Sequence, residues 1–187
     1  MILIYVLCSF FMMGCAFGQL PARQWLQNEY LPQISGKILY VGVGSYTQSY
    51  YLLTQTPEQF ETVDIDETKK KFGSPFGHYV ADFLDLEPTG EYDHCCLFGI
   101  MGHPPVTKTS IYTICDDDRI QQTFWHAHRM IKIGGTLQLG PNYCDVPGQD
   151  SKFWLQKFKM PPLDRYEIIY SRKGIDNMIW WGKKIRE

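Results

Sequence analysis

The first 22 residues of this sequence contain no charged side chain, and the first one is Arg23. This apolar run is shorter than the ~20 consecutive apolar residues that span a membrane, and small residues follow it. Ala16 and Gly18 stand at the −3 and −1 positions of a cleavage site before Gln19. We therefore expect residues 1–18 to be a signal peptide and residues 19–187 to be one secreted or lumenal domain without a membrane span. A signal anchor is the alternative.

The sequence also lacks a concentration of basic charge. It has 18 Lys and Arg against 20 Asp and Glu, which gives a net charge of −2. The longest basic run, residues 69–71, lies beside Asp64, Asp66 and Glu67. Proteins that bind nucleic acid or anionic membranes usually carry a clear basic excess. We therefore expect neither a nucleic acid nor a membrane surface as partner.

Metal-binding patterns are missing too. None of the six cysteines forms a CxxC pair, and no His/Cys spacing suits zinc, so we expect no structural metal. Cys8 and Cys15 belong to the expected signal peptide. The other four could form disulfides in a secreted protein, but Cys95 and Cys96 lie in an apolar run, where buried free thiols are more common.

Strand-like and helix-like segments alternate along the chain. Strand patterns occur at 37–43, 59–66, 78–86, 91–102 and 136–140. Leu26, Tyr30 and Ile34 have helical spacing, a short helix is expected through Tyr50 to Leu53, and the segment 116–135 carries a further helical pattern, including Ile131. Residues 166–184 resemble a β-hairpin. This order predicts one α/β domain, a doubly wound, mainly parallel sheet with an antiparallel C-terminal strand.

The first strand, KILYVGVGSY (37–46), runs into two glycines, Gly42 and Gly44. Such a turn is either simply tight or stripped of side chains so that a ligand can approach the backbone. Asp64 follows Gly44 by 20 residues at the end of the second strand, which is typical of an acid that binds a nucleotide ribose. A dinucleotide site would have a third glycine at Thr47, so an NAD-linked oxidoreductase is the weaker interpretation.

Five segments in this order resemble motifs of the class I S-adenosylmethionine-dependent methyltransferases, which have a Rossmann-like fold. They are ILYVGVGSY, TVDID, VADFLDL, EYDHCCLFGIMGHPP and RMIKIGGTLQL, and the similarity covers residues 25–184. The resemblance implies that S-adenosyl-L-methionine is the cofactor.

The resemblance also implies roles for individual residues. Asp64 would bind the ribose, and Asp82 and Phe83 would border the adenine. The full cofactor-binding set is Gly42, Gly44, Tyr46, Asp64, Ile65, Asp82, Phe83, Phe98 and Gly99. His103 matches a histidine that follows the family's fourth strand, and it is the candidate catalytic base.

Three positions depart from the family pattern. Tyr40 replaces an acid before the first glycine, Tyr46 replaces the third glycine, and Ile133 replaces a proline. Two functions therefore remain open. The first is a methyltransferase that acts on a small molecule or an exposed protein group, and the second is a non-catalytic binding protein with the same fold.

Overall fold

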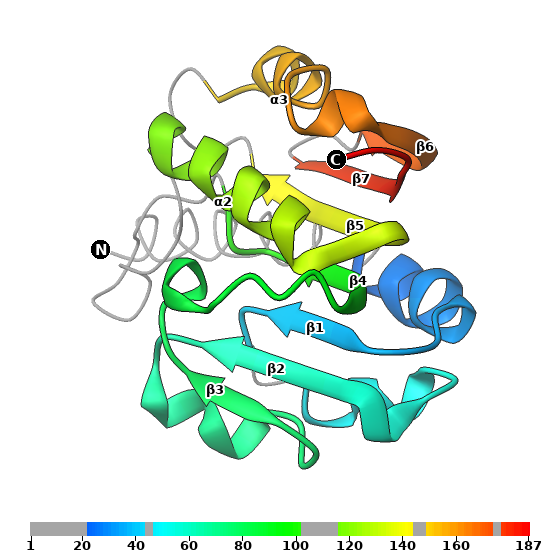
Figure 1. Cartoon of the computed structure of the whole chain (residues 1–187), viewed down its shortest axis with the longest axis vertical. Helices are drawn as coiled ribbons and strands as arrows, with labels where there is room; N and C mark the ends of the chain where they lie inside the picture. Colours follow the sequence, from blue (N-terminus) through cyan, green and yellow to red (C-terminus); the bar gives the residue numbers. More distant parts are fainter. Residues whose placement is uncertain (1–21, 44–46, 102–115, 144–148, 174–176) are drawn as a thin grey trace, which may run out of the picture.

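The structure is a computed structural model that describes residues 22–43, 47–101, 116–143, 149–173 and 177–187 (Figure 1). A seven-stranded sheet with the order β3-β2-β1-β4-β5-β7-β6 forms its centre. The strands are β1 (Ile38–Val41), β2 (Phe60–Asp64), β3 (His78–Val80), β4 (Tyr92–Leu97), β5 (Ile131–Tyr143), β6 (Tyr166–Lys173) and β7 (Asn177–Lys184). The strand expected over residues 37–43 is confirmed as β1, and it lies in the interior of the sheet.

The sheet is mainly parallel. β1 pairs in parallel with β2 and β4, β3 with β2, and β5 with β4. β7 is antiparallel to both β5 and β6. The expected fold class is therefore confirmed, including the antiparallel strand contributed by the C-terminal hairpin.

One face of the sheet is covered by α2 (Asp117–Met130) and α3 (Ser151–Lys157). Asp116 caps α2 through a hydrogen bond that its side chain accepts from the N–H of Arg119. Ile120 and Phe124 are fully buried, as their helical spacing predicts. Ile131 was expected in this helix, and that expectation is wrong. It begins β5 and pairs with Tyr92, because a β-branched side chain is readily placed in a strand.

The N-terminal helical segment belongs to the core of the other face. Residues 22–25 form an α-helical turn that continues as the π-helix η1 (Leu26–Tyr30) and the 3₁₀ helix η2 (Leu31–Gln33). Leu26, Tyr30 and Ile34 are buried in a core cluster with Ile38, as predicted. The sheet thus has an apolar core on each face, as a doubly wound fold requires.

Between β1 and β4, every helical segment among the described residues is a short 3₁₀ helix. These segments are η3 (Thr47–Leu53), η4 (Pro57–Gln59), η5 (Glu67–Phe72) and η6 (Phe83–Asp85), and η7 (Leu163–Arg165) lies further along. The helix expected through Tyr50 to Leu53 is therefore η3. A segment this short gains few hydrogen bonds for the cost of starting a helix.

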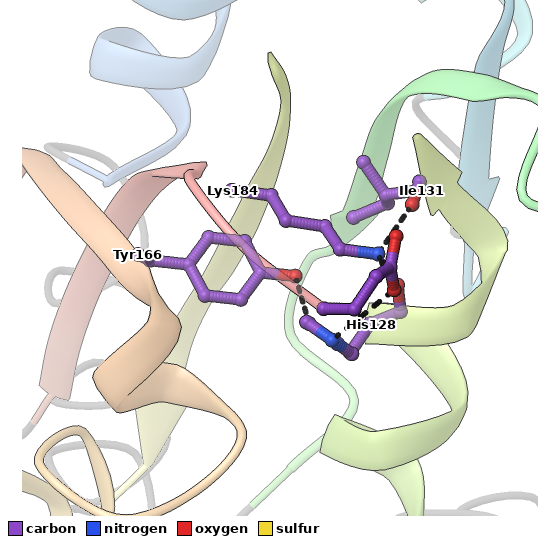
Figure 2. A network of polar contacts seen from close by, with 5 residues as sticks. His128, Ile131, Tyr166 and Lys184 are labelled. Carbon is purple, nitrogen blue, oxygen red and sulfur yellow. Dashed lines mark hydrogen bonds and ion pairs between the residues drawn. The ribbon is translucent and has the colours of Figure 1, made fainter. Parts of the chain in front are cut away.

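A buried lysine fixes the C-terminal end of α2 to β7 (Figure 2). Lys184 is 1% exposed, and its Nζ donates hydrogen bonds to the carbonyl oxygens of His128 (3.0 Å) and Ile131 (2.9 Å). The carboxylate of Glu187 accepts a third (2.8 Å). His128 is 2% exposed, and Nδ1 of its ring lies 3.2 Å from the hydroxyl oxygen of Tyr166. The observed end of α2, at Met130, is thus held by a residue far away in sequence.

Two further features bear on the sequence-based expectations. Cys95 and Cys96 are free, buried thiols, as predicted, and Cys115 and Cys144 lie outside the described residues. Within the described ranges, no helix has the length and hydrophobicity needed to cross a membrane. The expected signal peptide lies outside those ranges.

Candidate functional site

The carboxyl ends of β1, β2, β3 and β4 meet at one edge of the sheet, because these four neighbouring strands are parallel (Figure 1). Seven of the predicted site residues follow or end these strands: Gly42, Asp64, Ile65, Asp82, Phe83, Phe98 and Gly99. Gly44, Tyr46 and His103 lie outside the described residues. The part of the predicted site that the structure describes is therefore gathered at one edge.

The turn after β1 requires a glycine for structural reasons. Gly42 has φ = 85°, in the left-handed region that L-residues rarely adopt. A Cβ at this position would lie 2.1 Å from Cγ2 of Ile100, which follows β4. The N–H of Gly42 donates to the carbonyl oxygen of Val63 at 3.0 Å, which fastens the turn to β2. Turn geometry and the contact with Ile100 thus explain Gly42 without a ligand.

Asp64 organises the junction of β1 and β2. Its Oδ2 accepts a hydrogen bond from the N–H of Val43 (2.6 Å), and its Oδ1 accepts one from the N–H of Asp66 (2.8 Å). Burial raises the pKa of this carboxyl, and the N–H groups of Asp66 and Val43 oppose the rise. An ionised carboxylate has about four acceptor positions. Two of them remain for other donors.

The residue after Asp64 adds apolar surface to the same edge. Ile65 is 41% exposed, which is high for a large aliphatic side chain. The carboxylate of Asp66 instead caps η5. Its Oδ1 accepts hydrogen bonds from the backbone N–H of Thr68 (2.9 Å) and from the hydroxyl of Thr68 (2.7 Å). Asp64 and Ile65 together therefore offer hydrogen-bond acceptors beside an apolar surface.

Asp82, after β3, is held by two donors. Its Oδ1 accepts a hydrogen bond from the N–H of Leu84 (3.0 Å) as the cap of η6, and its Oδ2 forms an ion pair with Arg119 of α2. Phe83 is 5% exposed, and its ring lies edge-on to His126 with centroids 4.7 Å apart. The side chain of Phe83 therefore packs into the core under α2, and of these two residues it is Asp82 that presents a polar group at the edge.

The residues at 98–100, directly after β4, lie against the turn that follows β1. Phe98 is partly buried and packs against the core cluster that contains Tyr40 and Tyr50. Gly99 has φ = 71°, which allows the sharp bend that brings Ile100 onto Gly42.

Tyr40 stands where the resembling family has an acid, and it is a core residue. It is 1% exposed, and its ring contacts those of Phe60 (centroids 5.9 Å apart) and Tyr50 (5.8 Å).

Arg119 was missed by sequence reasoning. It lies in the first turn of α2, where the helix dipole favours acidic rather than basic side chains. A cation at this position, directly after Asp116, Asp117 and Asp118, was the signal that could have marked it. Its partner Asp82 lies 37 residues away in sequence, so the pair itself becomes visible only in the fold.

A groove of about 650 Å³ lies elsewhere, between the N-terminal helical segment and the strands β6 and β7. Its lining residues are Gln24, Trp25, Asn28, Glu29, Gln33, Ile169, Tyr170, Arg172 and Trp181. None of the predicted site residues is among them. This groove is therefore distinct from the edge that Asp64 and Asp82 form.

The described edge suits a nucleoside. Asp64 can accept hydrogen bonds from a pair of hydroxyl groups, Ile65 offers an apolar contact for a ring, and Asp82 can accept a hydrogen bond from an amino group. In parallel sheets, ligands bind at the carboxyl ends of the strands. The residues present thus fit the adenosine part of a cofactor.

Comparison with known proteins supports the same fold. No protein-family model matches the sequence, and neither does any curated protein. Among solved structures, the N-methyltransferase NodS from Bradyrhizobium japonicum WM9 aligns with a TM-score of 0.59 at 10% identity, covering 81% of this chain and 86% of NodS. A SAM-dependent methyltransferase from Methanosarcina mazei aligns with a TM-score of 0.55 at 16% identity, covering 84% and 96%. A candidate rRNA methylase from Clostridium thermocellum gives 0.59 at 13% identity, covering 84% and 94%.

At these identities the likeness concerns the fold. The chain has the class I methyltransferase fold, with the strand order and the antiparallel β7 described above.

Proposed function

We propose that this protein binds S-adenosyl-L-methionine at the carboxyl edge of its sheet and transfers the methyl group to a small molecule or an exposed protein group. The observation that carries the proposal is the Asp64 carboxylate at the end of β2. Backbone N–H groups of Val43 and Asp66 hold it in place, and acceptor positions remain for the two ribose hydroxyls. Ile65 follows β2 and Asp82 follows β3, and both would contact the adenine.

The bound cofactor would supply a methyl group already activated on a sulfonium, so the protein mainly has to align the acceptor. A general base is needed when the acceptor is a hydroxyl or a protonated amine. His103 is our candidate for that role, and it lies outside the described residues.

Titration calorimetry of the protein purified from a secreting host tests the proposal. We expect binding of S-adenosylmethionine and of S-adenosylhomocysteine, and no binding of NAD. Binding of NAD alone would favour the oxidoreductase interpretation. If neither S-adenosylmethionine nor NAD bound, the interpretation as a non-catalytic binding protein with this fold would replace the interpretation as an enzyme.

We expect the methyl acceptor not to be a nucleic acid. The net charge is −2. The run Lys69–Lys71 follows several acidic residues, and no second basic cluster lies close after it in the sequence, so few cations gather that could bind phosphates. A transfer assay with a methyl-labelled cofactor, comparing small molecules, peptides and RNA as acceptors, distinguishes the classes. Salt-sensitive transfer to RNA would overturn this part of the proposal.

We also propose that the protein enters the secretory pathway, with Gln19 as its first mature residue. The support is the charge-free run before Arg23, with Ala16 and Gly18 before the cleavage position. Intact-mass measurement of protein from a secreting host checks this. A full-length chain retained in the cytosol would overturn it.

A further inference from the structure

The ion pair between Arg119 and Asp82 joins the start of α2 to the turn between β3 and η6. The carboxylate of Asp82 is held at both oxygens, since Oδ1 accepts the N–H of Leu84 and Oδ2 faces the guanidinium of Arg119. An aspartate held by one hydrogen bond can still turn about its last torsion, whose energy profile is broad. The second contact removes that freedom. Asp82 therefore presents its remaining acceptor positions in one fixed direction.

This pair is poorly explained by stability. The side chain of Arg119 is 45% exposed and that of Asp82 23% exposed. Ion pairs this close to solvent contribute little to folding. The packing of Phe83 against His126 already fixes η6 to α2 without the ion pair. A role in binding is the better explanation for a cation placed where the helix dipole disfavours it.

We propose that Arg119 is a positioning residue that orients the Asp82 carboxylate toward the 6-amino group of the cofactor's adenine and thereby sets selectivity for that base. This inference rests on the proposed function. A fixed carboxylate accepts a hydrogen bond from an amino group, but it meets the lone pairs of a 6-oxo group with repulsion. A carboxylate that can rotate away discriminates less between the two bases.

α2 is suited to carry such a residue because it is held at both ends. Its N-terminus is capped by Asp116, and near its C-terminus the carbonyl oxygen of His128 accepts a hydrogen bond from buried Lys184. Arg119 therefore extends from a fixed helix, which is what accurate positioning requires.

Calorimetry with two ligands tests the inference. The ligands are S-adenosylhomocysteine and S-inosylhomocysteine, which differ in carrying a 6-amino or a 6-oxo group. We expect the wild type to prefer the adenosine compound. Arg119→Met should weaken its binding by about 5- to 10-fold, which corresponds to roughly 1–1.4 kcal/mol. The inosine compound should lose no affinity, so selectivity falls by the same factor. Arg119→Lys should keep most of the selectivity, because it retains the positive charge.

Two further variants separate positioning from other effects. Arg129→Met removes an exposed arginine from the other end of the same helix. This variant should bind both compounds with wild-type affinity. Asp82→Asn should lose the selectivity, and adding Arg119→Met to it should cause no further loss, because residues that act through one another are not additive.

The outcomes are distinct. An Arg119→Met variant with wild-type selectivity would overturn the inference, and so would an equal loss of affinity in the presence and absence of Asp82→Asn. In both cases the proposed function stands, because the wild type still binds the nucleoside. A wild type that binds neither compound would overturn the inference and the proposed function together.

Discussion

The backbone N–H of Val43 donates a hydrogen bond to Oδ2 of Asp64 over 2.6 Å, and this contact ties the turn after β1 to the end of β2. The other oxygen of the same carboxylate accepts the N–H of Asp66. One side chain thus orders two backbone segments at the edge where a nucleoside would bind. Asp64 therefore has a structural role beside the binding role that we propose for it.

Asp64→Ala should weaken binding of S-adenosylmethionine by roughly 10- to 100-fold or more. The reason is that hydrogen bonds to a charged acceptor contribute about 1.5–3 kcal/mol each, and each 1.4 kcal/mol is tenfold in affinity. The variant should also lose about 1–3 kcal/mol of stability, because the N–H groups of Val43 and Asp66 lose their acceptor. Calorimetry and thermal melting measure the two effects.

Asp66→Ala is the control for this experiment. Its carboxylate accepts from Thr68 in η5, so the variant should keep cofactor affinity and lose only a local cap, about 1 kcal/mol. Unchanged binding by a folded Asp64→Ala variant would show that this edge does not hold the ribose.

Gly42→Ala should destabilise the protein by about 2–5 kcal/mol. A left-handed backbone costs an L-residue about 1–2 kcal/mol, and overpacking costs typically 1–3 kcal/mol, here because the new methyl would lie 2.1 Å from the present Cγ2 of Ile100. Chemical denaturation measures the loss. In the background of Ile100→Ala, which removes that Cγ2, the same change should cost only the backbone part. Equal costs in both backgrounds would contradict the steric explanation.

Lys184→Met should destabilise the protein by about 2–4 kcal/mol. The carbonyl oxygens of His128 and Ile131 would lose their donor in a buried place, and the apolar side chain replaces only the packing. Lys183→Met is the matched control, since the neighbouring lysine is exposed and should change stability by less than about 0.5 kcal/mol. Similar losses for both variants would mean that the hydrogen bonds of Lys184 contribute little.

Stability should fall as the pH drops from about 6.5 toward 4, in part because of His128. Burial, helped by the positive charge of Lys184, lowers the pKa of this histidine to about 4. In that pH range the unfolded chain binds the proton and the folded chain does not, so the folded state is disfavoured by roughly 2–3 kcal/mol at the acid end. Above pH 6.5 the contribution is constant.

His128→Asn removes this titration and keeps a polar partner for Tyr166. Denaturation curves at several pH values should therefore show a smaller loss of stability between pH 6.5 and 4 in the variant. Parallel pH profiles of the variant and the wild type would contradict the assignment to His128.

Several features of the fold followed from the sequence alone. The burial of Leu26, Tyr30 and Ile34, the helix from Asp117 and the antiparallel hairpin were predicted from local periodicity, because the 3.6-residue and two-residue repeats and the turn residues are local properties. The placement of Asp64 and Asp82 at one edge of the sheet also followed, since parallel strands end on the same side.

Only the tertiary structure decided which partners these residues have. The contact of Ile100 with Gly42, the pairing of Arg119 with Asp82, and the hydrogen bonds from Lys184 to α2 join segments that are far apart in sequence. The orientation of Phe83 into the core also depended on His126 of α2. Such contacts depend on strand order and on how helices cross the sheet, which no local pattern encodes. The sequence therefore determined the order of the main elements and the edge, although not all of their ends, and the packing of those elements decided how each side chain at the edge is held.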